Sequence, residues 1–281
     1  MVRSIRSILS PLFVPGDRPE RFPKAEASGA DAIILDLEDA VAPDRKELAR
    51  ANIVSHGLEQ RPVIVRINAR RTPWFEPDCA ALAHASIAAI MLAKSESSAD
   101  IAAIHHIVGW QIPIVPLVET AAGVGSLPDL LSAPGVVRAA FGSFDFALDL
   151  GCTPNWESLL YARSEIVLRS RLAGRSAPID GVTSNLDDMQ AVEAEARRAG
   201  EMGFGGKLAI HPRQIAAIRG GLMPDEATIS WARSVIAAAD GEGGAARACG
   251  SMIDRPVVER ARRSLAAVDD RSLLETGIGP S

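Results

Sequence analysis

Two stretches decide the fold: Pro113–Gly125, with the sequence PIVPLVETAAGVG, and Ala139–Gly151, with the sequence AAFGSFDFALDLG. In each, a short apolar run is followed closely by an acid, Glu119 in the first and Asp145 in the second. In a parallel α/β protein, polar groups at the carboxyl ends of strands gather on one rim. Two carboxylates placed there repel each other unless a cation lies between them, and Mg²⁺ takes oxygen ligands. We therefore predict that Glu119 and Asp145 bind Mg²⁺; the alternative is that both cap the helices that follow.

Working outward from these stretches, short apolar runs alternate with amphipathic segments along most of the chain. Runs without strict alternation are typical of strands buried on both faces. Eight repeats of strand and helix predict a (β/α)₈ TIM barrel over residues 1–220. The expected strands are Leu12–Val14, Ala32–Leu35, Val63–Ile67, Ala89–Leu92, Ile114–Val118, Ala139–Phe141, Ala177–Ile179 and Lys207–Ile210, and Ala177–Ile179 has the weakest pattern. Amphipathic helices are expected at Asp44–His56, Asp188–Met202 and Gln214–Arg219.

The pattern changes after the last of these strands, and residues 221–281 are predicted to form a C-terminal extension. We expect helices at Pro224–Ala239 and Pro256–Val268, with a flexible or hairpin-like break at 241–250. The last stretch, Ser272–Ser281, is predicted to be a disordered tail.

Composition excludes several classes of protein. The 281 residues carry a net charge of −5 and hold no run rich in Lys and Arg, so nucleic acid is not expected as a partner. No stretch of eighteen apolar residues occurs, so no membrane span is expected. The three cysteines form no metal-ligand pattern and are predicted to be reduced, as in a cytoplasmic protein. Arg3 and Arg6 resemble a transit peptide, but a polar lead into the first strand is favoured because no long apolar core follows.

Further polar residues fall at the predicted strand ends. Arg66, within VIVRIN, would be costly to bury without an anion, so we predict that it clamps a substrate carboxylate. The alternative is an internal ion pair with the acidic segment Asp36–Asp39. We expect these acids to orient Arg66 and the water around the metal; a purely structural role for them is the alternative. Lys94, at a predicted strand end, leaves open an alternative in which its amine forms a Schiff base with the substrate. That chemistry needs no metal and would leave the pair Glu119 and Asp145 unexplained. His211 is predicted to be a structural histidine in a tight turn rather than a base.

At these residues the chain resembles the citrate lyase β-subunit-like family, within the HpcH/HpaI aldolase superfamily. The resemblance covers nearly the whole chain and is carried by FVPGDRPERFPKA, DLEDAV, VRIN, AKSES, VETAAGV, FGSFDFALDLG, GFGGKLAIHPRQI and GSMIDRPVVERAR, in that order. It implies a Mg²⁺-dependent (β/α)₈ barrel with a C-terminal lid extension, assembled as a homotrimer or a hexamer of two trimers. Such enzymes cleave or form the bond between an acetyl- or propionyl-thioester and a keto acid.

The resemblance also implies roles for individual residues. Glu119 and Asp145 match the metal ligands, and Arg66 matches the arginine that holds the substrate carboxylate. Phe13, Arg18 and Lys24 match positions that contact the coenzyme A thioester. Asp254 matches an acid that the lid of a neighbouring subunit delivers. Two departures, AKSES for the common PKVES and GFGGK for the common GFDGK, are expected to tune the pocket.

The implied reaction is a retro-aldol (Claisen-type) cleavage in which Arg66 fixes the carboxylate and Asp254 donates or removes the α-proton. The prediction is a lyase for a 3-hydroxyacyl-CoA thioester such as malyl-, citramalyl- or citryl-CoA. Three alternatives stay open: a citrate lyase β subunit acting on a citryl-acyl-carrier-protein thioester within a complex, a malyl-CoA thioesterase, and a catalytically silent barrel that serves as a binding module.

Overall fold

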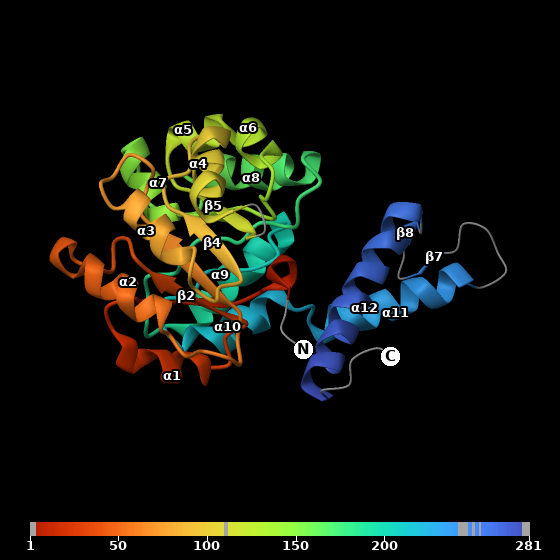
Figure 1. Ribbon diagram of the computed structural model, residues 1–281. Coiled ribbons are helices and arrows are strands. Elements are labelled where there is room, and N and C mark those ends of the chain that lie inside the picture. Colours follow the sequence, from red (N-terminus) through yellow and green to blue (C-terminus); the bar gives the residue numbers. More distant parts are fainter. Residues whose placement is uncertain (1–3, 110–111, 241–246, 249–250, 253, 277–281) are drawn as a thin grey trace. The chain divides into compact units, whose positions relative to one another are not determined.

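The computed structural model in Figure 1 describes residues 4–109, 112–240, 247–248, 251–252 and 254–276. The chain divides into two compact units, Val2–Leu222 and Met223–Ser281. Of the described helices, none is long and apolar enough to cross a lipid bilayer.

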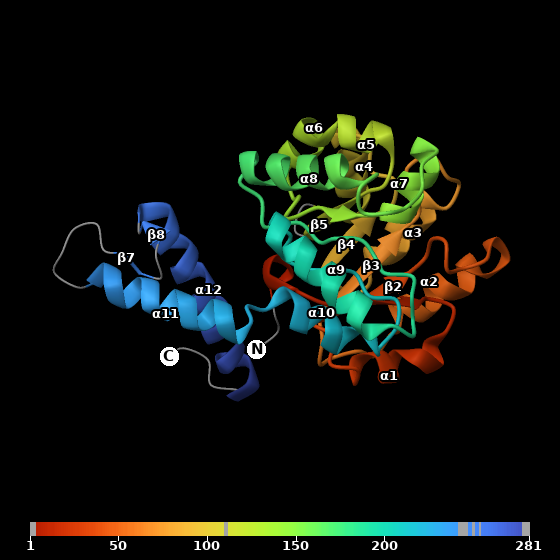
Figure 2. The same cartoon turned by 180° about the vertical axis from the view of Figure 1, so that it is seen from behind.

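The larger unit is built around a curved parallel sheet, with its helices on the outside in both views (Figures 1 and 2). The strands follow chain order, β1 Pro11–Pro15, β2 Ala32–Asp36, β3 Val63–Ile67, β4 Ala89–Leu92, β5 Ile114–Val118 and β6 Ala140–Phe141. The helices are α1 Phe22–Glu26, α2 Lys46–Val54, α3 Phe75–Leu82, α4 Ser98–Val108, α5 Ala121–Gly125, α6 Leu127–Ser132, α7 Ser143–Leu150, α8 Leu160–Leu172, α9 Met189–Met202 and α10 Gln214–Leu222. Short 3₁₀ turns occupy η1 Ile5–Ser7, η2 Pro19–Arg21 and η3 Pro43–Arg45.

Both faces of the sheet are buried, as the near-continuous apolar runs predict. Because successive side chains point to opposite faces, Ile33 and Leu35 of β2 join the cluster that packs against the helices. Ile34, between them, joins a second cluster inside the curve of the sheet, with Met91, Val115 and Leu117. The six strands predicted at β1–β6 are confirmed to within one residue at each end.

The last two predicted strands are reduced to single bridges. Ile179 pairs in parallel with Ala140, Asp180 with Lys207, and Ala209 with Leu12 of β1. Ala177–Ile179 and Lys207–Ile210 are therefore not full strands. Ala177–Ile179 offers only three apolar residues, and Gly205 and Gly206 precede Lys207, where glycine weakens a strand. Hydrogen bonds still continue around this side, from Asp180 N–H to Gly206 O and from Phe13 N–H to Ala209 O.

The smaller unit contains two helices, α11 Glu226–Asp240 and α12 Arg255–Thr276, and two short antiparallel strands, β7 Arg247–Ala248 and β8 Ser251–Met252. Its described core consists of Ala232, Val235 and Ala261, with Trp231 packed against them. The prediction of a disordered tail from Ser272 is wrong for Ser272–Thr276, which continue α12. The reason is the helix-favouring composition of RSLLE, which extends the preceding turns. Residues 277–281 lie outside the described residues.

Candidate metal and substrate site

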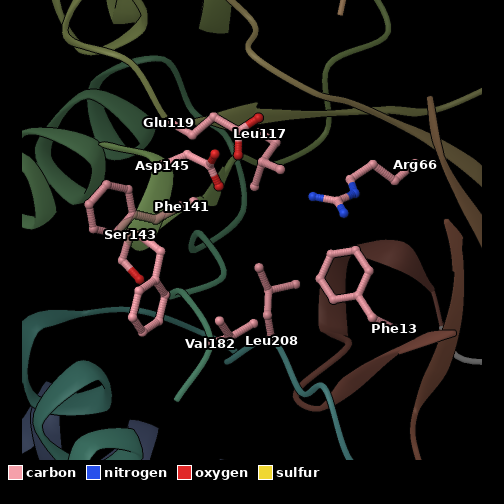
Figure 3. A pocket seen from close by; sticks show the side chains of 11 residues that line it. Phe13, Arg66, Leu117, Glu119, Phe141, Ser143, Asp145, Val182 and Leu208 are labelled. Atoms are coloured by element: carbon pink, nitrogen blue, oxygen red, sulfur yellow. The ribbon is translucent and has the colours of Figure 1, made fainter. Parts of the chain in front are cut away.

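A cavity of about 60 Å³ opens at the carboxyl ends of the strands (Figure 3). Four residues that the sequence singles out line it together: Phe13 of β1, Arg66 of β3, Glu119 just after β5, and Asp145 in the first turn of α7. Its other lining residues are Leu117, Phe141, Gly142, Ser143, Phe144, Val182 and Leu208. The parallel order of the strands thus brings residues 13, 66, 119 and 145 to one place.

Glu119 is almost fully buried, with 1% of its surface exposed. Burial, followed by the charge of Glu38, raises the pKa of Glu119 to about 8, although Arg66 and Lys94 oppose the shift. Asp145, half-buried, adds a smaller repulsion in the same direction. A cation bound to Glu119 would offset both the cost of burying this carboxylate and its repulsion by Glu38 and Asp145. The helix-cap alternative fails for both acids, because Thr120 caps α5 and no side chain caps α7.

The donor set suits Mg²⁺. Among the described residues, no group of three or more His, Cys, Asp or Glu side chains is arranged to hold a metal. Two carboxylates would leave the remaining positions to water and substrate, as is usual for Mg²⁺ at catalytic sites. The residues present therefore fit magnesium, and Glu119 and Asp145 are the two carboxylates that would bind it.

Two backbone features hold Glu119 in place. The N–H of Lys94 donates a hydrogen bond of 2.7 Å to Glu119 Oε1. To do so Lys94 adopts a φ of 47°, the one positive φ of a non-glycine residue among those described, and such a strained conformation often marks a functional site. On the other side, a Cβ at Gly142 would lie 2.3 Å from Glu119 Oε2, so only glycine allows this close approach.

The side chain of Lys94 is committed to an ion pair. Its Nζ lies 2.5 Å from Glu38 Oε1. Burial lowers the pKa of Lys94, but the hydrogen bond and charge of Glu38 outweigh burial and raise this pKa above its ordinary value. A Schiff base requires a neutral amine, so the raised pKa disfavours that alternative.

Arg66 makes the internal ion pair that the sequence left as an alternative. Nε and Nη2 donate to the two carboxylate oxygens of Asp36 at 2.7 and 2.6 Å, and Nη1 lies 3.0 Å from Glu38 Oε2. The guanidinium also stacks over Phe13, with Cζ 4.8 Å from the ring centroid. Since a guanidinium has five N–H groups, donors remain for one carboxylate in the pocket. The ion pair and the predicted substrate contact are therefore compatible.

Sequence reasoning missed the support behind this pair. Lys46 of α2 is buried, and its Nζ donates to the carbonyls of Leu37 and Glu38 at 2.6 and 2.8 Å and to Asn68 Oδ1 at 2.9 Å. Asn68 in turn donates to Asp78 Oδ2 at 2.6 Å. The network fixes the loop that carries Glu38. No sequence signal distinguishes Lys46 from the exposed lysines of an amphipathic helix.

The remaining predicted residues lie elsewhere. Arg18 and Lys24 are exposed, near η2 and on α1, and do not line the cavity. Asp254 belongs to the smaller unit, where its Oδ1 accepts a hydrogen bond from the N–H of Val257 at the beginning of α12. His211 accepts a hydrogen bond from the N–H of Arg213 through Nδ1, as expected of a histidine in a turn. Gly205, the departure in GFGGK, faces Ala177 and the buried Arg138 rather than the pocket.

Residues 9–212 match the family model of HpcH/HpaI aldolase/citrate lyase. The chain belongs to this family. A citrate lyase subunit beta-like protein of Deinococcus radiodurans is 34% identical over 274 residues, covering 92% of this chain and 96% of the relative. An L-malyl-CoA/beta-methylmalyl-CoA lyase of Cereibacter sphaeroides is 33% identical, covering 82% and 83%. A (3S)-malyl-CoA thioesterase of the same species is 32% identical, covering 96% and 97%.

Solved structures agree with this family assignment. CitE of Mycobacterium tuberculosis in complex with magnesium, acetoacetate and coenzyme A superposes with a TM-score of 0.87 at 34% identity, covering 94% of this chain and all of that one. The same protein with magnesium and pyruvate gives 0.77 at 31% identity, covering 93% and 100%. The predicted α/β fold and a lyase of the citrate lyase β or malyl-CoA lyase type are thereby confirmed. The magnesium of these structural neighbours agrees with the predicted cofactor.

Proposed function

We propose that this chain is a Mg²⁺-dependent carbon–carbon lyase that cleaves, or in reverse forms, a 3-hydroxyacyl-CoA thioester. The observation that carries the proposal is the meeting of Glu119, Asp145 and Arg66 in one cavity at the strand ends. The relatives named as malyl-CoA lyase and as citrate lyase subunit beta, and a structural neighbour crystallised with magnesium and coenzyme A, support it.

The chain's own residues would position the reacting groups. Glu119 and Asp145 would hold Mg²⁺, which when bound supplies Lewis-acid polarisation of the substrate's hydroxyl and carboxylate oxygens. Arg66 would fix the carboxylate through the donors that Asp36 and Glu38 leave free, and its own ion pairs keep the guanidinium from swinging away. Phe13, stacked under Arg66, would limit the approach of water.

Cleavage of the carbon–carbon bond needs no added oxidant or reductant. The hydroxyl proton passes to solvent water, the carbinol carbon becomes the oxo carbon of a keto acid, and the electron pair of the broken carbon–carbon bond passes to the thioester as an enolate. Protonation at the α-carbon then gives the acyl-CoA. We assign that proton to Asp254, delivered by the lid, residues 221–281, of a neighbouring subunit, and contacts with the coenzyme to Arg18 and Lys24.

We further infer that the larger unit, residues 1–220 in the sequence prediction, is a closed (β/α)₈ barrel. The parallel bridges from Ala140 to Ile179, from Asp180 to Lys207 and from Ala209 to Leu12 support this, because they link the last strand to the first. A cytoplasmic homotrimer or hexamer remains part of the proposal. The free thiols of Cys79 and Cys152 are compatible with that compartment.

The test is a mass-spectrometric assay of the purified chain with malyl- and citramalyl-CoA, with Mg²⁺ and with EDTA. Mg²⁺-dependent release of acetyl-CoA and a keto acid is expected, and Glu119→Gln and Asp145→Asn should each abolish both turnover and Mg²⁺ binding. Free coenzyme A with intact malate would instead identify a thioesterase. The (3S)-malyl-CoA thioesterase relative, 97% of whose length aligns with this chain, keeps that alternative open. Activity only with an acyl-carrier-protein thioester would identify a citrate lyase β subunit.

A further inference from the structure

A buried cluster of four charged side chains lies behind one wall of the pocket. Asp180 is fully buried, with Oδ1 2.9 Å from Arg163 Nε and Oδ2 3.4 Å from Lys207 Nζ. Lys207 is also fully buried, Arg163 is 5% exposed, and Glu195 of α9 lies 3.3 Å from the Lys207 ammonium. None of the four lines the cavity, so any effect on a metal or a substrate must pass through residues that do.

Each cation of the cluster contacts this wall at one place. The Arg163 guanidinium lies over the ring of Phe141, with Cζ 5.3 Å from the ring centroid, and Phe141 lines the cavity. Lys207 Nζ donates a hydrogen bond of 2.8 Å to the carbonyl of Gly181. Gly181 directly precedes Val182, another residue that lines the cavity. The cluster therefore supports the wall from the side that faces away from the pocket.

The hydrogen bond to Gly181 takes the place of strand pairing. In the part of the chain that the structure describes, the parallel bridges of this segment end at Asp180, which pairs with Lys207. Past that bridge, the Gly181 carbonyl accepts its hydrogen bond from the Lys207 side chain. Because an ammonium donates a charge-assisted hydrogen bond, this contact is stronger than one between two neutral groups. The position of Gly181 thus depends on Lys207.

Gly181 in turn supports the first turn of α7. Among the described residues no side chain caps this helix, and its first residue, Ser143, is 5% exposed. A Cβ at Gly181 would overlap the Ser143 hydroxyl oxygen and would lie 2.9 Å from Ser143 Cβ and 3.1 Å from the Phe141 carbonyl oxygen. The backbone of Gly181 therefore lies directly against Ser143. Asp145 belongs to the same turn and lies on the same side of the pocket in Figure 3.

We propose that Lys207 is a positioning residue for Asp145. Its ammonium holds the Gly181 carbonyl, and Gly181 holds Ser143. Ser143 then sets the place of the Asp145 carboxylate at the metal site. Apolar side chains often replace a buried ion pair without loss of stability, so folding alone does not require these charges, whereas a metal ligand must be held closely. The inference rests on the Mg²⁺ site of the function proposed above.

The first test replaces Lys207 by methionine, which is nearly as long and has no donor. Mg²⁺ affinity is measured by calorimetry, well below the melting temperature of every variant. Lys207→Met should lower this affinity by about 10- to 100-fold, as expected when the support of a metal ligand is lost. Arg175→Met is the matched control, because Arg175 also donates to backbone carbonyls, at 2.7 Å to Leu131, and does not line the cavity. It should lower the melting temperature and leave Mg²⁺ affinity within about threefold.

A second pair of variants keeps every charge of the cluster. Gly181 does not adopt a left-handed backbone conformation, so its replacement by alanine strains only the contact with Ser143 and Phe141. Gly181→Ala should lower Mg²⁺ affinity by about tenfold, because the methyl group displaces the first turn of α7. Adding Ser143→Ala removes the hydroxyl oxygen that the methyl group overlaps. The double variant should therefore recover about threefold or more of the loss.

Unchanged Mg²⁺ affinity in either folded variant, Lys207→Met or Gly181→Ala, overturns the inference and leaves the Mg²⁺ site standing. A loss of the same size in Arg175→Met also overturns it, since the effect would then follow from destabilisation alone. If Lys207→Met does not fold, Gly181→Ala and its double variant decide. If the unaltered chain binds no Mg²⁺, the proposed function fails, and the inference fails with it.

Discussion

Replacing Gly142 by alanine tests the geometry of the metal site most directly. The φ of Gly142 is −93°, so no left-handed backbone requires a glycine there. The added methyl group would lie 2.3 Å from Glu119 Oε2 and 2.5 Å from Glu119 Cβ, where ordinary contact begins near 3.4 Å. Glu119 must therefore retreat by roughly 1 Å, a displacement that costs on the order of 100-fold in rate when it affects a catalytic group. We expect both Mg²⁺ affinity and kcat to fall by about 100-fold, and the free energy of unfolding to fall by about 1–3 kcal/mol from overpacking.

The assay is a calorimetric Mg²⁺ titration beside steady-state turnover and thermal melting. Gly125→Ala is the matched control, because a Cβ at Gly125, the last residue of α5, meets no atom within 4 Å. That variant should bind Mg²⁺ as the unaltered chain does, with a stability change below about 1 kcal/mol. If Gly142→Ala melts within a degree or two of the control and binds Mg²⁺ with unchanged affinity, the assignment of Glu119 as a ligand held by this contact is refuted.

Three further outcomes follow from the same site. Because burial and Glu38 raise the pKa of the metal-free Glu119 carboxyl to about 8, protons compete with the metal below that pH. Mg²⁺ affinity should fall about tenfold per pH unit from pH 8 to pH 6 and stay level above pH 8; a flat profile by calorimetry would contradict the shift. Arg66→Lys loses the paired hydrogen bonds to the buried Asp36, so the melting temperature should drop. KM for the thioester should rise about 10- to 100-fold, and an unchanged KM would exclude a contact between Arg66 and the substrate. Lys94→Gly allows the backbone to keep φ 47° and should retain Mg²⁺ affinity within about threefold. Lys94→Val places a β-branched residue at a positive φ and should lower Mg²⁺ affinity by about tenfold or more. Equal affinities of the two variants would show that the Lys94 N–H does not hold Glu119.

Short local segments of the sequence determine much of the fold. The runs at Val63–Ile67, Ala89–Leu92 and Ile114–Val118 form strands at the predicted residues, because a strand buried on both faces needs only a short apolar segment bounded by turns. Where the local signal is short or ambiguous, prediction fails. Ala177–Ile179 is apolar over only three residues, and the structure gives it one bridge. The tail after Ser272 reads as polar but is helical through Thr276.

The sequence by itself determined which side chains reach the rim, since Arg66, Glu119 and Asp145 follow from strand ends and strand order alone. Only the tertiary structure decided how they are held. The Lys94 N–H that binds Glu119 is 25 residues away, and the Lys46 that supports Glu38 reaches Asn68 across 22 residues. Such contacts depend on the register between strands and the exact course of two loops. A pattern of residue types carries neither, because the energy of a buried hydrogen bond varies over tenths of an ångström whereas hydrophobic periodicity fixes positions only to within a turn.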